Sequence, residues 1–155
     1  MENDKQVIIT IGREYGSGGH LIADMLGEKY GLPVYDSTII ETIAEEKGLD
    51  LSKLKHFDEK PRNRLFTRSI DGYSNSPEDV TAYMEFDFLR EKAKVGESFI
   101  VVGRCGSSIL KGYKGVMSFF VTADMPEKIQ RVATEFHVSN EDAEVMIQKN
   151  NKSRK

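Results

Sequence analysis

The chain has 155 residues, 39% of them hydrophobic and 30% charged, which is enough apolar surface for one soluble domain with a sizeable core. Its formal net charge of -3 at pH 7 argues against a nucleic-acid partner, because the overall field repels a polyanion. Cys105 is the only cysteine, so an intrachain disulfide is excluded and a cysteine-based metal site is disfavoured. We expect a cytoplasmic protein with no membrane partner, since the sequence has neither a signal-peptide pattern nor an apolar run of about 20 residues.

The first predicted elements flank a glycine-rich turn. The apolar run 7–11 is typical of a strand buried on both faces, and helical spacing of apolar residues follows at Leu21, Ile22, Met25 and Leu26. The turn between them contains Gly16, Ser17, Gly18 and Gly19. The backbone N–H groups of such a junction lie at the positive end of the helix dipole, which predicts an anion site, most often for phosphate. The alternative is a tight turn whose glycines only permit positive φ.

A second strand and two helices are predicted before Gly96. A short strand over 34–36 precedes a helix that Asp36 or Ser37 caps and that ends near Gly48. The apolar face of this helix consists of Ile39, Ile40, Ile43 and Ala44. The signal is weak over 51–76. A helix over 77–94 follows, because a Ser-Pro-Glu-Asp sequence opens it and Gly96 ends it.

Two more buried strands are predicted over 98–103 and 116–122. One helix follows from Pro126 through Phe136, and another follows a capping box at 139–142. Strands that alternate with helices predict a parallel α/β sheet, whose ligands bind beyond the carboxyl ends of the strands. The polar residues at these ends are Arg13, Asp36, Arg104 and Asp124.

The glycine turn matches only part of the phosphate-binding pattern G-x-x-x-x-G-K-[ST]. With Gly18 as the second glycine, Arg13 replaces the first glycine, Gly19 replaces the lysine and His20 replaces the hydroxyl residue. The strand, turn and helix remain, and they can hold a phosphate through backbone amides without the lysine.

Five separated motifs resemble the cytidylate kinase-like family, whose members are related to nucleoside monophosphate kinases within the P-loop superfamily. The motifs are Ile-Thr-Ile-Gly-Arg-Glu-Tyr-Gly-Ser-Gly-Gly (9–19), Val-Tyr-Asp-Ser (34–37), Val-Val-Gly-Arg-Cys-Gly (101–106), Phe-Phe-Val-Thr-Ala-Asp (119–124) and Asn-Asn-Lys-Ser-Arg (150–154). Together they are spread along almost the whole chain, from residue 9 to residue 154. In this family an arginine before the loop and a glycine in place of the lysine are usual.

The resemblance implies an α/β fold of the P-loop NTPase type, with a parallel sheet of four or five strands flanked by helices and a small helical lid. A single nucleotide-kinase-like domain would span 1–155, with an acceptor-side helical segment near 37–95 and the lid near 125–155. The family continues beyond the lid with a final strand and helix, which we expect to be absent from this chain.

The implied reaction is phosphoryl transfer from ATP, with Mg²⁺, to a nucleoside monophosphate such as CMP. Catalysis of this kind is mainly positioning and charge neutralisation. The donor phosphates would bind the backbone amides of Gly16, Ser17, Gly18, Gly19 and His20. The catalytic cations would be Arg13, in place of the lysine, and Arg131, Lys152 and Arg154, which close over the transferring group. The acceptor would face Asp36, Ser37 and Arg104.

The sequence departs from true cytidylate kinases after the third strand. Val102 and Cys105 stand where those enzymes carry aspartates, so the residue credited with orienting magnesium is absent. We therefore predict no protein ligand for the metal ion.

Each candidate residue also has a structural interpretation. Arg13 could pair with Glu14 or Asp36 at the surface, and Asp36 could serve only as a helix cap. Lys152 and Arg154 could belong to a solvated helix end.

Three functions stay open at this point. The favoured one is a kinase-like enzyme, and the alternatives are a nucleotide- or phosphate-binding protein with little or no activity and an interaction domain with a purely structural loop. The arginines that gather at one sheet edge favour the first two. An uncovered edge strand would also allow two copies to pair as a homodimer.

Overall fold

The computed structural model describes residues 5–36, 38–52, 69–70, 73–74, 77–103 and 106–153. Its main sheet has four parallel strands in the order β2-β5-β1-β6, with β1 at Ile8–Arg13, β2 at Val34–Tyr35, β5 at Phe99–Val102 and β6 at Val116–Val121. This sheet confirms the predicted parallel α/β class. A separate antiparallel pair, β3 (Ser69–Ile70) with β4 (Tyr73–Ser74), was not predicted.

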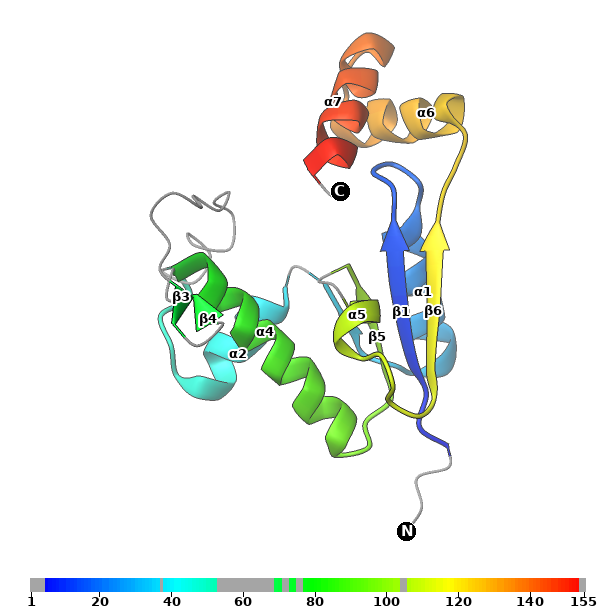
Figure 1. The fold of residues 1–155 in the computed structure, drawn as a ribbon. Helices are drawn as coiled ribbons and strands as arrows, with labels where there is room; N and C mark the ends of the chain where they lie inside the picture. Colours follow the sequence, from blue (N-terminus) through cyan, green and yellow to red (C-terminus); the bar gives the residue numbers. More distant parts are fainter. Residues whose placement is uncertain are drawn as a thin grey trace.

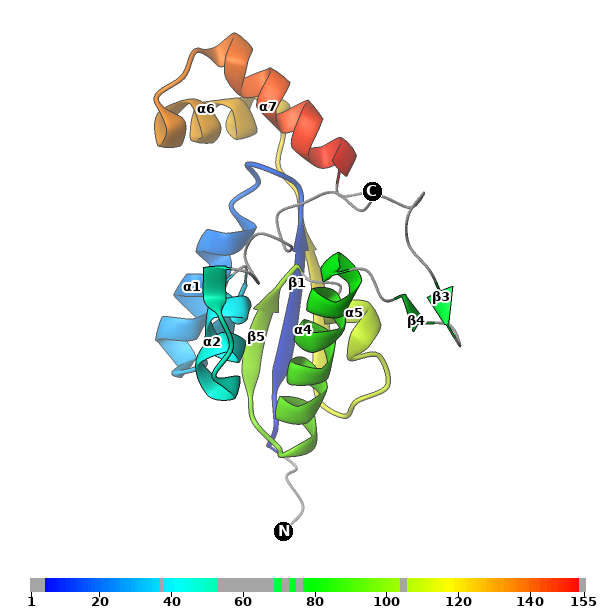
Figure 2. The same cartoon turned by 90° about the vertical axis from the view of Figure 1, so that its left-hand side faces the viewer.

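The helices surround the sheet on both faces and at one end. They are α1 (Gly19–Tyr30), α2 (Ile39–Lys47), α4 (Pro77–Lys94), α5 (Gly106–Ile109), α6 (Met125–Phe136) and α7 (Asn140–Ser153). Helix α1 covers one face, and α4 and α5 cover the other (Figures 1 and 2). Helices α6 and α7 form a hairpin beyond the carboxyl ends of β1 and β6 (Figure 1). None of the described helices combines the length and apolar character needed to cross a bilayer.

Local signals placed several helices well. Helix α4 has the predicted bounds, and α2 ends at the predicted glycine, Gly48, which adopts the left-handed conformation. The predicted capping box opens α7, because the Asp142 N–H donates to the Ser139 hydroxyl over 3.1 Å. The N-cap of α2 is Thr38 and not Asp36 or Ser37, but Asp36 contributes nearby by accepting a hydrogen bond from the Thr38 N–H.

The two faces of the sheet pack against different helices because successive strand residues point to opposite sides. Ile8 joins Phe99 and Val101 in a buried cluster with α2 and α4. Ile9 and Ile11 pack instead with β5 residues beneath α1. The core therefore lies on both sides of the central strands β1 and β5. The glycine turn follows the carboxyl end of β1.

The fourth strand is not buried on both faces as predicted. Met117, Phe119 and Phe120 of β6 are 45%, 54% and 67% exposed. Within the described residues β6 is hydrogen-bonded along one side only, to β1, so it is an edge strand. An apolar run cannot distinguish a central strand from an edge strand, which explains the error.

Helix α1 buries its small residues fully, whereas of its large apolar residues only Leu26 packs against the core. Its buried residues are Gly19, Ala23 and Gly27, whereas Leu21 and Met25 are more than half exposed. A Cβ atom at Gly27 would lie 2.6 Å from Cγ2 of Val34, so only a small residue permits this close approach to the sheet.

We expect overpacking at this contact to destabilise the fold. Ala23→Leu inserts a larger side chain at a fully buried position and should reduce the free energy of unfolding by about 1–3 kcal/mol in urea titrations. Met25→Leu, on the exposed side of the same helix, is the control and should change it little. Equal effects of the two substitutions would contradict the observed orientation of α1.

Candidate functional site

The glycine turn leads directly into the amino terminus of α1. Gly18 is the N-cap and has φ of 87°, a left-handed conformation that glycine adopts without strain. Helix α1 has no side-chain cap, and the N–H groups of Gly18, Gly19 and His20 have no acceptor among the described residues. These amides are available to an anion at the positive end of the helix dipole.

Ser17 contributes less than the sequence suggested. Its N–H donates to the Glu14 carbonyl over 3.2 Å, and its side-chain oxygen is buried without a hydrogen-bond partner in the described part of the chain. The amide cradle is therefore centred on Gly18, Gly19 and His20.

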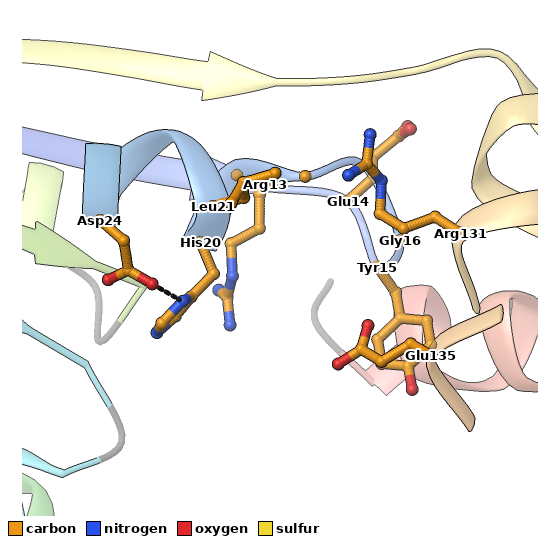
Figure 3. Close-up of a pocket in the computed structure, with 11 residues that line it drawn as sticks. Arg13, Glu14, Tyr15, Gly16, His20, Leu21, Asp24, Arg131 and Glu135 are labelled. Carbon is orange, nitrogen blue, oxygen red and sulfur yellow. Dashed lines mark ion pairs between the residues drawn. The ribbon is translucent and has the colours of Figure 1, made fainter. Parts of the chain in front are cut away.

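A pocket of about 480 Å³ lies over this turn (Figure 3). Six of the predicted site residues line it, namely Arg13, Gly16, Gly18, Gly19, His20 and Arg131. Lys152 and Asp36 are not among its lining residues. Ser37, Arg104 and Arg154 lie outside the described residues, as does Cys105. The structure thus brings the loop and two of the predicted arginines together.

Arg13 occupies the space that a lysine at position 19 would need. A Cβ atom at Gly19 would lie 2.6 Å from the Cβ of Arg13, and one at Gly103 would lie 2.5 Å from its Nη1. The Arg13 side chain therefore runs across the first turn of α1 toward the end of β5. Positions 13 and 19 face each other too closely for both to carry side chains. The common pattern has glycine and lysine there, and this chain has arginine and glycine.

Arg131 reaches the same loop from the opposite direction. It belongs to α6, whose next residue, Val132, is buried in the hairpin core. Its guanidinium packs against Gly18, where an added Cβ atom would lie 3.0 Å from Cζ. Figure 3 shows Arg13 beside His20 and Arg131 approaching the loop from the helix hairpin. Two guanidinium groups and three available amides therefore border one pocket.

His20 links the start of α1 to the end of β2. Its Nδ1 lies 3.1 Å from Oδ2 of Asp24, and its Nε2 is hydrogen-bonded to Asp36, which also accepts from the Thr38 N–H over 2.8 Å. The hydrogen bond with Asp36 raises the pKa of His20 despite partial burial. Burial raises the pKa of Asp36, but the hydrogen bonds from His20 and Thr38 outweigh this effect and lower it overall.

Comparison with known proteins identifies the family of this chain. The chain matches the model of the cytidylate kinase-like family over residues 8–155. It belongs to the cytidylate kinase-like family. A cytidylate kinase from Methanopyrus kandleri is 29% identical over 157 residues, a match that covers 95% of this chain and 72% of that relative.

Solved structures place this family member among the kinase folds. An uncharacterized protein from Eubacterium ventriosum aligns with a TM-score of 0.72 at 32% identity, covering 97% of this chain and 74% of the other. Shikimate kinase from Bacteroides thetaiotaomicron aligns with a TM-score of 0.56 at 14% identity over 96% and 78% of the two chains, a likeness of fold alone. The fold is thus of the P-loop kinase type, as predicted.

Two contacts that shape the site in this cytidylate kinase-like chain were not predicted. The Lys128 ammonium pairs with Glu14 over 2.8 Å, and the Tyr15 N–H donates to Oδ1 of Asn151 over 2.7 Å. The partners are separated by 114 and 136 residues, and no local pattern relates residues so far apart. Only the basic and polar end of the last helix marked the segment that contains Asn151.

We expect the contact between His20 and Asp36 to stabilise the fold most between their ordinary pKa values, 3.8 and 6.5. Because the pKa of His20 is raised in the folded state, the full contribution of His20 to folding stability is present below pH 6.5. This contribution is lost as the pH rises through the folded-state pKa of His20. The lowered pKa of Asp36 means that its contribution is lost as the pH falls below 3.8 through the folded-state pKa.

His20→Gln tests this dependence by urea unfolding at about pH 5.5 and about pH 9. The substitution should cost more stability at the lower pH, although by less than about 1 kcal/mol because the ring is half exposed. A cost that is the same at both pH values would contradict the assigned protonation of His20, which faces Asp24 and Asp36.

The close contact of positions 13 and 19 predicts strong coupling between them. Gly19→Ala should destabilise the wild type, although alanine in a helix is normally favoured over glycine by about 1 kcal/mol. In the Arg13→Gly background the facing Cβ is gone, so the same substitution should be neutral or stabilising. Urea unfolding of the wild type, the two single variants and the double variant should give a coupling energy of at least about 1 kcal/mol. Additive effects of the two substitutions would show that side chains at positions 13 and 19 do not compete for the same space.

Proposed function

We propose that this protein transfers a phosphoryl group from ATP to a nucleoside monophosphate such as CMP. Membership of the cytidylate kinase-like family supports this class of reaction, and the M. kandleri relative is named as a cytidylate kinase. The observation that carries the proposal is the convergence of Arg13 and Arg131 on a pocket floored by the amides of Gly18, Gly19 and His20. Such a pocket matches the charge of a polyphosphate.

The residues divide the work of phosphoryl transfer between binding and charge stabilisation. The three amides hold oxygens of the donor phosphates, and Arg13 supplies the cation that lysine provides in the common pattern. Arg131 faces the same phosphates from the helix hairpin and stabilises the charge of the transferring group. An arginine suits both positions because its planar fork binds phosphate oxygens in pairs. No side chain forms a covalent intermediate in this mechanism.

The acceptor side is assigned to the region around Asp36. Asp36 lies next to His20, which lines the pocket, so the carboxylate sits at the rim beyond the donor cradle. The proposal also keeps as acceptor residues Ser37, which follows Asp36, and Arg104, which follows β5, the strand that pairs with β2. Lys152 and Arg154 remain proposed lid residues, although Lys152 is exposed and does not line the pocket.

Magnesium is assigned to the nucleotide and not to a protein cage. The described part of the chain contains no group of three or more His, Cys, Asp or Glu side chains that could hold a metal ion. Mg²⁺ is commonly held by substrate phosphates and water with few carboxylates, and it neutralises phosphate charge. The available amides and arginines fit the phosphates of Mg-ATP without further ligands.

A second candidate is a protein that binds nucleotide or phosphate with little or no turnover. It is favoured by the residues at positions 19 and 20, where Gly19 and His20 replace the lysine and the hydroxyl residue of the pattern. His20 is also engaged by two carboxylates. This alternative shares the pocket with the kinase and differs only in catalysis.

A phosphoryl-transfer assay with ATP, Mg²⁺ and a panel of nucleoside monophosphates separates these functions. We expect turnover, and we expect Arg13→Ala and Arg131→Ala each to lower kcat/KM by about 10²–10³-fold, since each removes a preorganised cation. Arg90→Ala, an exposed arginine of α4, is the control and should retain activity.

The other outcomes are equally informative. Thermal stabilisation by ATP without turnover would establish the binding protein in place of the kinase. Neither turnover nor stabilisation, in a protein that is folded by circular dichroism, would refute both and leave a structural loop.

A further inference from the structure

One peptide unit of the glycine turn is held from both sides. The N–H of Tyr15 donates to Oδ1 of Asn151 in α7, and the C=O of Glu14, in the same peptide unit, accepts from the Ser17 N–H. The first bond comes from the far end of the helix hairpin, and the second closes the turn itself. The orientation of this peptide therefore depends on α7, and the path of Gly16 to Gly18 depends on this peptide.

The helix hairpin surrounds the same stretch with further contacts. Tyr15 stacks on Phe136 of α6, with ring centroids 6.5 Å apart, and packs against the hairpin core. Gly16 lies against Val132, where an added Cβ atom would be 2.9 Å from Cγ2. Lys128 pairs with Glu14 while its own side chain is only 7% exposed. The hairpin is thus docked on the turn as a support, and it does more than cover the pocket.

We propose that Asn151 is a positioning residue for the phosphate loop. Its side-chain carbonyl fixes the Glu14–Tyr15 peptide, and this peptide sets the turn that presents the Gly18 and Gly19 amides to a polyphosphate. The inference rests on the proposed function for the identity of that ligand. Without the Asn151 acceptor, the Tyr15 N–H loses its hydrogen bond to α7, and the peptide gains freedom to rotate.

This arrangement couples docking of the hairpin to occupancy of the loop. Arg131 of the hairpin and the loop amides border the same pocket, so a polyphosphate bound there would contact both the hairpin and the loop. Coupling between hairpin docking and anion binding is reciprocal. The hairpin contact that orders the loop is therefore strengthened when the loop binds an anion. Asn151 lies where the hairpin meets the loop and is not among the residues that line the pocket.

Amide hydrogen exchange without any ligand tests the contact directly. In Asn151→Ala the Tyr15 N–H should exchange at least tenfold faster than in the wild type. Asn151→Asp keeps an acceptor oxygen of the same reach and should retain most of the protection. Asn150→Ala is the matched control, because the Asn150 side-chain amide donates to the Met146 carbonyl within α7.

Calorimetric titration with inorganic pyrophosphate then tests positioning. Asn151→Ala should bind pyrophosphate at least fivefold more weakly than the wild type, while Asn150→Ala should bind like it. Unchanged Tyr15 exchange in Asn151→Ala, or faster exchange with unchanged pyrophosphate affinity, would overturn the inference. If the wild type itself does not bind pyrophosphate, the proposed function fails, and the exchange rates alone decide whether Asn151 holds the loop.

Discussion

The site depends on the ion pair between the buried Lys128 side chain and Glu14, which is partly exposed. A lysine that is almost fully removed from water must keep its charge paired, because an isolated buried ammonium is strongly destabilising. The hydrogen bond from Lys128 also lowers the pKa of Glu14, so the carboxylate stays charged. The pair joins the first residue after β1 to α6 and fixes how that helix lies on the turn. Arg131 follows Lys128 by one helical turn on the same face, which brings its guanidinium to Gly18.

Small residues on the other side of the turn complete the constraint. Helix α1 lies close to the sheet because Ala23 and Gly27 face it, and Gly19 allows the Arg13 side chain to cross the first turn. The positive charge beside the loop amides therefore comes from Arg13 of strand β1 and not from a lysine at position 19 of helix α1. The replacement of lysine by arginine keeps a positive charge near the amides but changes the side from which it approaches them. Gly103 leaves room for the tip of the same side chain at the end of β5.

Local order was predictable from the sequence, and long-range contacts were not. The bounds of α4 and the start of α7 followed from caps and glycine stops, which act within a few residues. The glycine turn was visible because strand, turn and helix are contiguous. The exposure of β6 depends on what lies beside it in the sheet, and the buried face of α1 depends on how closely the helix approaches the sheet. Neither can be predicted from the periodicity of apolar residues. Lys128 and Asn151 meet the turn only in the folded chain.

The two arginines at the pocket pose an electrostatic problem that the hairpin contacts resolve. Arg13 and Arg131 carry like charges that repel each other across one pocket, which the carboxylates of Glu14, Asp24 and Glu135 also line. In the absence of an anion, the docked hairpin is held by the ion pair of Lys128 with Glu14, by the stacking of Tyr15 on Phe136 and by the Asn151 hydrogen bond. An anion between the guanidinium groups would turn repulsion into attraction. The same contacts therefore preorganise the pocket for the polyphosphate that we propose it binds.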